Sequence, residues 1–104
     1  METNEPHEVR LTRDAEKDLR RLRAWEDRIT RALLALEQDP YLGHPLTGSL
    51  AGVRSLEFSL PGAAYRAVYV VREDVRRCLV FQIGPHEGFY QKAERRYRSL
   101  RPRL

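Results

Sequence analysis

Three β-rich segments follow one another in the second half of the chain, separated only by short turns, and this arrangement constrains the fold most. Residues 53–60, 65–72 and 77–83 are rich in β-branched, aromatic and other apolar residues. Pro61-Gly62 and Glu73-Asp74 supply the turn residues between them. Because connections this short join only antiparallel neighbours, we expect a three-stranded antiparallel meander.

The first half is predicted to be mainly helical. Thr12 is suited to begin a helix, and apolar residues then recur at helical spacing as far as Leu36. The charge-dense stretch 23–28 favours a helical hairpin, with one long helix over 13–38 as the alternative. Asp39-Pro40 ends the helical pattern, because the residue before a proline disfavours helical geometry.

The remaining segments complete an α+β domain. Residues 7–12 alternate weakly and predict a first strand, residues 40–50 contain proline and glycine and predict a loop, and residues 87–98 predict a last helix. The expected order is β-α-α-β-β-β-α, with the N-terminal strand and helical hairpin packed on a small antiparallel sheet. The helices are expected to cover one face of that sheet. Residues 1–104 form one domain, in which 1–6 are loose and 99–104 are a frayed basic tail.

Basic residues are unevenly distributed along the chain. Residues 1–52 carry a net charge of −2 and residues 53–104 carry +6, and 17 of the 19 basic residues are arginines. Arginine matches phosphate geometry, although a GC-rich genome would also enrich it. The asymmetry indicates an anionic partner for the second half, with nucleic acid as the usual candidate. Near the C-terminus, Lys92, Arg95 and Arg96 are predicted RNA contacts, with a solvated helix face as the alternative.

Several classes of protein are disfavoured. Cys78 is the single cysteine, which excludes an internal disulfide and a cysteine-rich metal site. The sequence contains no Gly-rich phosphate loop and no apolar stretch near the roughly 18 residues that a membrane span requires. We expect a soluble, cytoplasmic protein with no metal, no small-molecule cofactor and no membrane partner.

An acid, a base and a cation are brought together by the expected meander. Arg66 lies inside an apolar strand, where its charge is costly unless it meets an anion. Glu57 lies on the polar face of the preceding strand, and His86 and Tyr90 follow the last strand. Such a set suits phosphodiester cleavage. The structural alternatives are an Arg66–Glu57 cross-strand pair, a surface His86 that caps the last helix, and a Tyr90 that packs in the core.

The order and spacing of four segments resemble the RelE branch of the RelE/ParE toxin superfamily. These segments are 46–48 (LTG), 65–69 (YRAVY), 83–90 (IGPHEGFY) and 93–96 (AERR), and the resemblance extends from about Val9 to Arg96. It implies a toxin of a type II toxin–antitoxin pair that acts as a metal-free mRNA interferase. Many such toxins enter the ribosomal A site, where the ribose 2′-OH attacks the adjacent phosphorus to leave a 2′,3′-cyclic phosphate and a 5′-OH. A cognate antitoxin holds the toxin inactive.

The resemblance also implies residue roles. Arg66 matches the strand arginine that grips the scissile phosphate. His86 lies where relatives have an arginine or a histidine, and as a histidine it is expected to protonate the 5′-O leaving group near neutral pH. Tyr90 matches a tyrosine that stacks on a base or orients the nucleotide. Glu57 lies where some relatives have a glutamate general base and others a lysine. Arg54 is the expected second phosphate contact.

One departure keeps other functions open. The paired lysines of some relatives are absent from the second strand, where this sequence has Glu57 and Ser59. The alternatives are a ParE-like inhibitor of DNA gyrase, which would share the fold, and a degenerate toxin that only binds its antitoxin.

Overall fold

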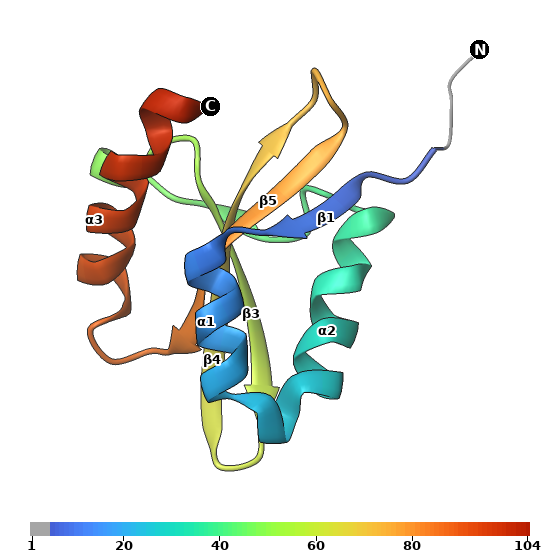
Figure 1. Ribbon diagram of the computed structural model, residues 1–104, viewed down its shortest axis with the longest axis vertical. Helices are drawn as coiled ribbons and strands as arrows, with labels where there is room; N and C mark the ends of the chain where they lie inside the picture. Colours follow the sequence, from blue (N-terminus) through green and yellow to red (C-terminus); the bar gives the residue numbers. More distant parts are fainter. Residues whose placement is uncertain (1–4) are drawn as a thin grey trace.

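The computed structural model describes residues 5–104, which form a five-stranded sheet with three α-helices (Figure 1). Residues 1–4, part of the segment expected to be loose, lie outside the described residues. The predicted order of helices and strands is confirmed, with one further two-residue strand, β2, between α2 and β3. The elements are β1 (Glu8–Leu11), α1 (Arg13–Arg21), α2 (Glu26–Leu34), β2 (His44–Pro45), β3 (Arg54–Leu60), β4 (Ala63–Arg72), β5 (Arg77–Pro85) and α3 (Phe89–Leu100).

The antiparallel meander is confirmed by the pairing of β3, β4 and β5. The strands lie in the order β1-β5-β4-β3-β2, and both β3–β4 and β4–β5 are antiparallel. Gly62 in the turn between β3 and β4 has a φ of +83°, a conformation that glycine adopts without strain. A register shift in the β4–β5 pairing leaves Phe81 as an extra residue, a β-bulge that alters which backbone groups of β5 face each neighbour.

Two strands extend this meander at its edges. β1 pairs in parallel with β5, from Glu8 opposite Arg77 to Leu11 opposite Val80. The two-residue strand β2 lies within the segment expected to be only a loop, and it pairs antiparallel with β3. The sheet is therefore mixed, with its one parallel pair formed by the strand farthest away in sequence.

The helical hairpin is confirmed. The Thr12 hydroxyl accepts a hydrogen bond from the Ala15 backbone N–H at 3.2 Å, which caps α1. The short 3₁₀ turn Arg23–Trp25 then separates α1 from α2, within the charge-dense stretch expected to hold a turn. One long helix over 13–38 is therefore excluded.

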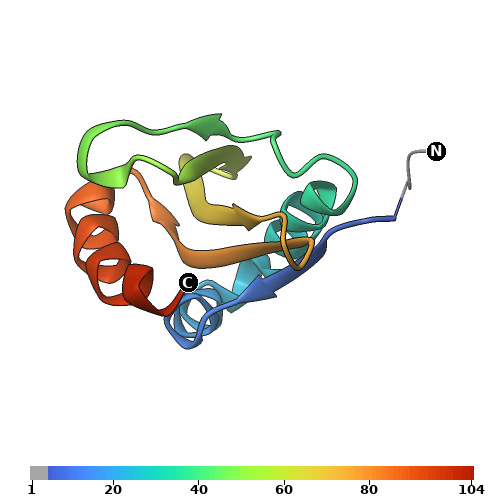
Figure 2. The ribbon, with the colours of Figure 1, turned by 90° about the horizontal axis from the view of Figure 1, so that it is seen from above.

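The helices cover both faces of the sheet, so the expectation that they cover one face is wrong. α1 and α2 pack on one face around Ala15, Ile29 and Leu33. α3 packs on the other, where Phe89, Ala93 and Tyr97 meet Val68, Val70 and Phe81. Figure 2 shows α2 and α3 on opposite sides of the strands. β5 runs through the middle of the fold with apolar side chains on both of its faces.

The C-terminal helix differs from the expected one at both ends. α3 begins at Phe89, after Gly88 with a φ of +65°, rather than at Glu87. The residues expected to form a frayed tail are helical instead, because α3 continues to Leu100 and a 3₁₀ turn follows over Arg101–Arg103. Among residues 5–104, no helix has the length and apolar character that crossing a membrane requires.

Candidate active site

Glu57 and Arg66 lie directly opposite each other on neighbouring strands, on the sheet face that α3 partly covers. One pair further toward the turn, Ser59 and Ala64 are exposed, whereas Val68, on the other side of Arg66, is buried beneath α3. Figure 1 shows the β3–β4 hairpin extending beyond the first turn of α3. Arg66 and Glu57 therefore lie at the border between the covered core and an open surface.

Arg66 is in contact with all three of the other predicted catalytic residues. Its Nε lies 3.4 Å from a carboxylate oxygen of Glu57, and its Nη1 hydrogen-bonds to His86 Nδ1. Its guanidinium carbon lies 5.3 Å from the centre of the Tyr90 ring, a cation–π distance. Arg66 Nε is buried and makes no hydrogen bond within residues 5–104, although the Glu57 oxygen is close. The guanidinium therefore has one buried donor that makes no hydrogen bond and lies close only to the Glu57 carboxylate.

His86 lies on the connection between β5 and α3 and is exposed. Its carbonyl accepts a hydrogen bond from the Phe89 N–H at 3.2 Å, which fixes the loop just before the helix. A guanidinium can only donate, so His86 Nδ1 accepts from Arg66 and the neutral ring carries its proton on Nε2. The structure thus directs the protonated nitrogen of His86 away from Arg66.

Tyr90 lies beside Arg66 and also packs against the core that contains Phe89, Ala93 and Tyr97. Its ring is half-buried between Arg66 and Phe89, which it meets edge-on at a centroid distance of 5.4 Å. Its hydroxyl lies 3.4 Å from Ser55 Oγ on β3. The start of α3 therefore faces the sheet and places an aromatic ring against the cation.

The residues predicted to contact RNA are dispersed. Arg54 lies at the other end of β3, where its Nε donates to the Gly43 carbonyl at 2.7 Å and its guanidinium stacks on Tyr41. Lys92 is half-exposed, and its Nζ lies 3.9 Å from Asp18. Arg95 is exposed on α3. The structure gives Arg54 a loop-anchoring contact, and it brings none of these three into the Arg66 cluster.

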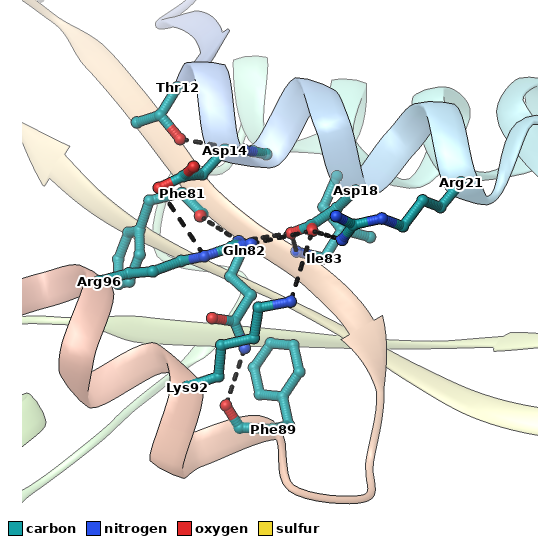
Figure 3. Close-up of polar contacts among 11 residues, drawn as sticks. Thr12, Asp14, Asp18, Arg21, Phe81, Gln82, Ile83, Phe89, Lys92 and Arg96 are labelled. Atoms are coloured by element: carbon teal, nitrogen blue, oxygen red, sulfur yellow. Dashed lines mark hydrogen bonds and ion pairs between the residues drawn. The ribbon is translucent and has the colours of Figure 1, made fainter.

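Arg96 has a buried partner that sequence analysis missed (Figure 3). Its Nη1 and Nη2 donate to the two carboxylate oxygens of Asp18 at 2.6 and 3.1 Å, and Nη1 also donates to the Phe81 carbonyl at 3.1 Å. Asp18 is 4% exposed and also accepts the Ile83 backbone N–H at 3.0 Å. This guanidinium makes three hydrogen bonds inside the protein, which disfavours a role for Arg96 in contacting RNA.

A signal for Asp18 is present in the sequence. It lies three residues after Ala15 and four before Leu22, within the apolar stripe of α1. A carboxylate there must be buried, and a buried carboxylate requires donors from another element. The stripe thus indicated a polar partner for α1, but its identity depends on how α3 packs.

Other chemistry at the described residues is limited. Cys78 is buried under α1 and α2, and burial raises the pKa of its thiol to about 11, so it remains protonated and unreactive near neutral pH. Residues 5–104 contain no group of three or more His, Cys, Asp or Glu side chains placed to hold a metal ion.

Known proteins resemble this chain in both sequence family and fold. A comparison with curated protein sequences gave no match. Among solved structures, the RelBE2 toxin–antitoxin complex of Mycobacterium tuberculosis has a chain with 24% identity and a TM-score of 0.70, covering 78% of this chain and 99% of that one. A mutant of the Escherichia coli toxin RelE in the free state has 20% identity and a TM-score of 0.67, and the match covers 86% of this chain and 93% of that one. The YoeB/ParE toxin of Agrobacterium tumefaciens has 23% identity and a TM-score of 0.62, and the match covers 76% of this chain and 98% of that one.

These structural likenesses establish a RelE-like fold. The sequence itself matches the family model described as ParE-like toxin of type II bacterial toxin-antitoxin system, over residues 9–94. That match includes β1, both helices of the hairpin, the entire meander and the first half of α3. The chain therefore belongs to the ParE-like toxins of bacterial type II toxin–antitoxin systems.

Proposed function

We propose that this toxin is an mRNA interferase that cleaves RNA without a metal ion, at the cluster around Arg66. The observation that carries the proposal is that one guanidinium contacts a carboxylate, an imidazole and an aromatic ring at an open edge of the fold. Membership of the ParE-like family does not by itself imply this combination of guanidinium, carboxylate, imidazole and aromatic ring. A cation, two titratable groups and a stacking surface are the parts that phosphodiester cleavage uses.

The proposed reaction assigns one role to each group. Glu57 takes the proton of the ribose 2′-OH, whose oxygen attacks the adjacent phosphorus. Arg66 neutralises, through its guanidinium charge, the charge that develops on the phosphoryl oxygens. His86 acts as the imidazolium that forms when Nδ1 binds a proton in place of the Arg66 donor, and it gives its Nε2 proton to the 5′-oxygen as the P–O5′ bond breaks. The products are a 2′,3′-cyclic phosphate and a 5′-OH, with Glu57 left protonated and His86 left neutral, and proton exchange with water restores both groups.

Tyr90 and the basic surface of α3 are assigned to binding. The Tyr90 ring beside Arg66 offers a face on which a base next to the scissile phosphate can stack. Lys92 and Arg95 lie further along the same helix and add contacts to the RNA backbone. Cleavage of mRNA during translation would place the protein in the cytoplasm with the ribosome as a partner. The likeness to toxins solved in RelBE complexes supports a cognate antitoxin as the inhibitor.

A second candidate is inhibition of DNA gyrase by a ParE-like toxin, which the family description favours. The two functions make different demands on Arg66. Arg66→Ala should abolish the toxicity of an interferase and preserve antitoxin binding, whereas a gyrase inhibitor should be largely indifferent to it. A degenerate toxin would not inhibit growth even as the wild type.

The test is to map the 5′ ends of a defined mRNA after incubation with the purified protein in a reconstituted translation reaction, and again without ribosomes. New 5′-OH ends only with ribosomes would support a ribosome-dependent interferase. New ends in both reactions would retain the chemistry and remove the ribosome requirement. No new ends in either reaction would contradict the proposal and favour the gyrase or degenerate alternatives.

A further inference from the structure

We propose that Asp18 and Arg96 are positioning residues for the active site, because they fix the end of β5 and with it the loop that carries His86. The inference rests on the proposed function for its kinetic test, but its structural test does not depend on it. Neither side chain touches the Arg66 cluster. Their effect on the reaction would pass through the backbone of residues 81–83.

β1 stops before the end of β5. β1 accompanies β5 only as far as Val80, so the edge of β5 beyond this point has no strand beside it. The bulge at Phe81 makes the Phe81 carbonyl and the Ile83 N–H face this open edge. Arg96 donates to the former and Asp18 accepts from the latter, so two side chains replace the missing strand (Figure 3).

A third buried contact fixes the other end of the loop. Gln82 is 2% exposed, and its amide donates to the Phe89 carbonyl at 2.8 Å. Phe89 is the first residue of α3 and directly precedes Tyr90. The connection between β5 and α3 is thus held at Ile83 on one side and at Phe89 on the other, with His86 midway between them.

The kind of interaction matters as much as its place. An apolar pair would fill this interior space with similar or better stability, because burying two charges is costly. A bidentate arginine–carboxylate pair with additional bonds to the backbone instead sets direction and register. Catalytic groups must be held to within about 0.5 Å, and a shift of about 1 Å costs on the order of 10²-fold in rate. The Asp18–Arg96 pair is suited to provide that precision.

The experiment compares Asp18→Asn and Arg96→Lys with the control Arg21→Gln. Asn keeps the shape and the acceptor for Ile83, and Lys keeps the charge without the fork. Arg21 lies 3.5 Å from the same carboxylate, but its side chain is 67% exposed and, among the described residues, it hydrogen-bonds only to Asp18, so its loss should have little effect. In ribosome-dependent cleavage, we expect kcat to fall by about 10- to 100-fold in the first two variants, with KM within about threefold of the wild type.

A second readout separates positioning from stability. The chain has three histidines, and their imidazole signals can be followed by NMR in each folded variant. We expect the His86 signal and the amide signals of residues 84–90 to shift or broaden in Asp18→Asn and Arg96→Lys. His7, which pairs with Glu73 next to the β4–β5 turn, should be unchanged. Arg21→Gln should resemble the wild type throughout.

The outcomes distinguish the two proposals. Folded Asp18→Asn and Arg96→Lys proteins with unchanged His86 signals and unchanged kcat would overturn the positioning role. If Asp18→Asn fails to fold, Arg96→Lys decides by the same criteria. A wild-type protein that cleaves no RNA would contradict the proposed function, and the NMR shifts would then decide the positioning role alone.

Discussion

Two arginine–carboxylate pairs differ sharply within this small fold. Arg96 and Asp18 form a bidentate pair at 2.6 and 3.1 Å, with side chains that are 14% and 4% exposed. Arg66 and Glu57 approach only at 3.4 Å, and Glu57 is 54% exposed. The first pair also binds backbone groups of β5, whereas the second leaves Arg66 Nε without a hydrogen bond inside the described part of the chain.

The difference indicates what each pair can do. A buried pair whose guanidinium already makes three hydrogen bonds inside the protein is poorly placed to take a ligand, and breaking it leaves a buried charge without its main partner. A loose pair at an open surface costs little to separate and can exchange its carboxylate for a phosphate. Arginine enrichment in the second half therefore conceals two roles, one that maintains the fold and one suited to chemistry.

The largest expected effect is on the rate of RNA cleavage, at the cluster that contains the exposed Arg66–Glu57 pair (the open pair). His86→Ala should reduce cleavage by about 10²- to 10⁴-fold, because it removes the proposed acid. The urea midpoint should change little, because His86 is exposed on a loop. His44→Ala, on the exposed strand β2, is the control and should cleave normally. An unchanged rate in His86→Ala would remove it from the mechanism.

The buried Asp18–Arg96 pair (the closed pair) should contribute more to the free energy of unfolding than the open pair does. Asp18→Ala should lower the free energy of unfolding by about 3–5 kcal/mol, because it leaves the buried Arg96 with only the exposed Asp14, at 3.9 Å, as a counter-ion. Glu57→Ala should cost less than about 1 kcal/mol, as expected for an exposed ion pair. Urea denaturation of both variants measures the difference directly. Equal losses would show that the two pairs do not differ as their geometry indicates.

The geometry of the open pair can be tested without removing its charge. Arg66→Lys keeps a cation but loses the planar fork that reaches Glu57, His86 and Tyr90 together, so cleavage should fall at least about tenfold. Thermal stability should stay near that of the wild type. A lysine variant with near-full activity would mean that only charge, and not the fork, is required.

The Cys78 thiol provides a finer test of the comparison. Burial raises its pKa to about 11, so the stability that its neutral form contributes is present below the ordinary value of 9.0 and is lost as the pH rises through about 11. At pH 8, labelling by a thiol reagent should therefore require opening of the fold. Labelling of Cys78 should be faster than in the wild type for Asp18→Ala and unchanged for Arg66→Ala. Equal labelling rates in the two variants would contradict a larger stabilising role for the closed pair.

Much of the fold was predictable because its determinants are local. Alternating side chains and the Pro61-Gly62 turn specify the meander, and Thr12 specifies the start of α1. The parallel pairing of β1 and the placement of α3 on the opposite face depend on contacts between distant segments. No local pattern encodes these contacts, and the expectation of one covered face therefore failed.

The candidate site was also predictable only where local sequence determines it. Register across the β3–β4 turn brings Glu57 to Arg66, and the motif around His86 places it at the end of β5. The role of Arg96 was not predictable, because its neighbours in sequence suggest an exposed basic helix. Only the packing of α3 against β5 and α1 shows that Asp18 already neutralises it.

The most direct test of the account is to measure cleavage and unfolding together in Arg66→Ala. We expect the yield of new mRNA 5′ ends to fall by about 10²- to 10³-fold, with a urea midpoint close to that of the wild type. Wild-type cleavage by a folded Arg66→Ala protein would contradict the assignment of chemistry to the open pair, and so would a loss of cleavage that simply follows a loss of folding.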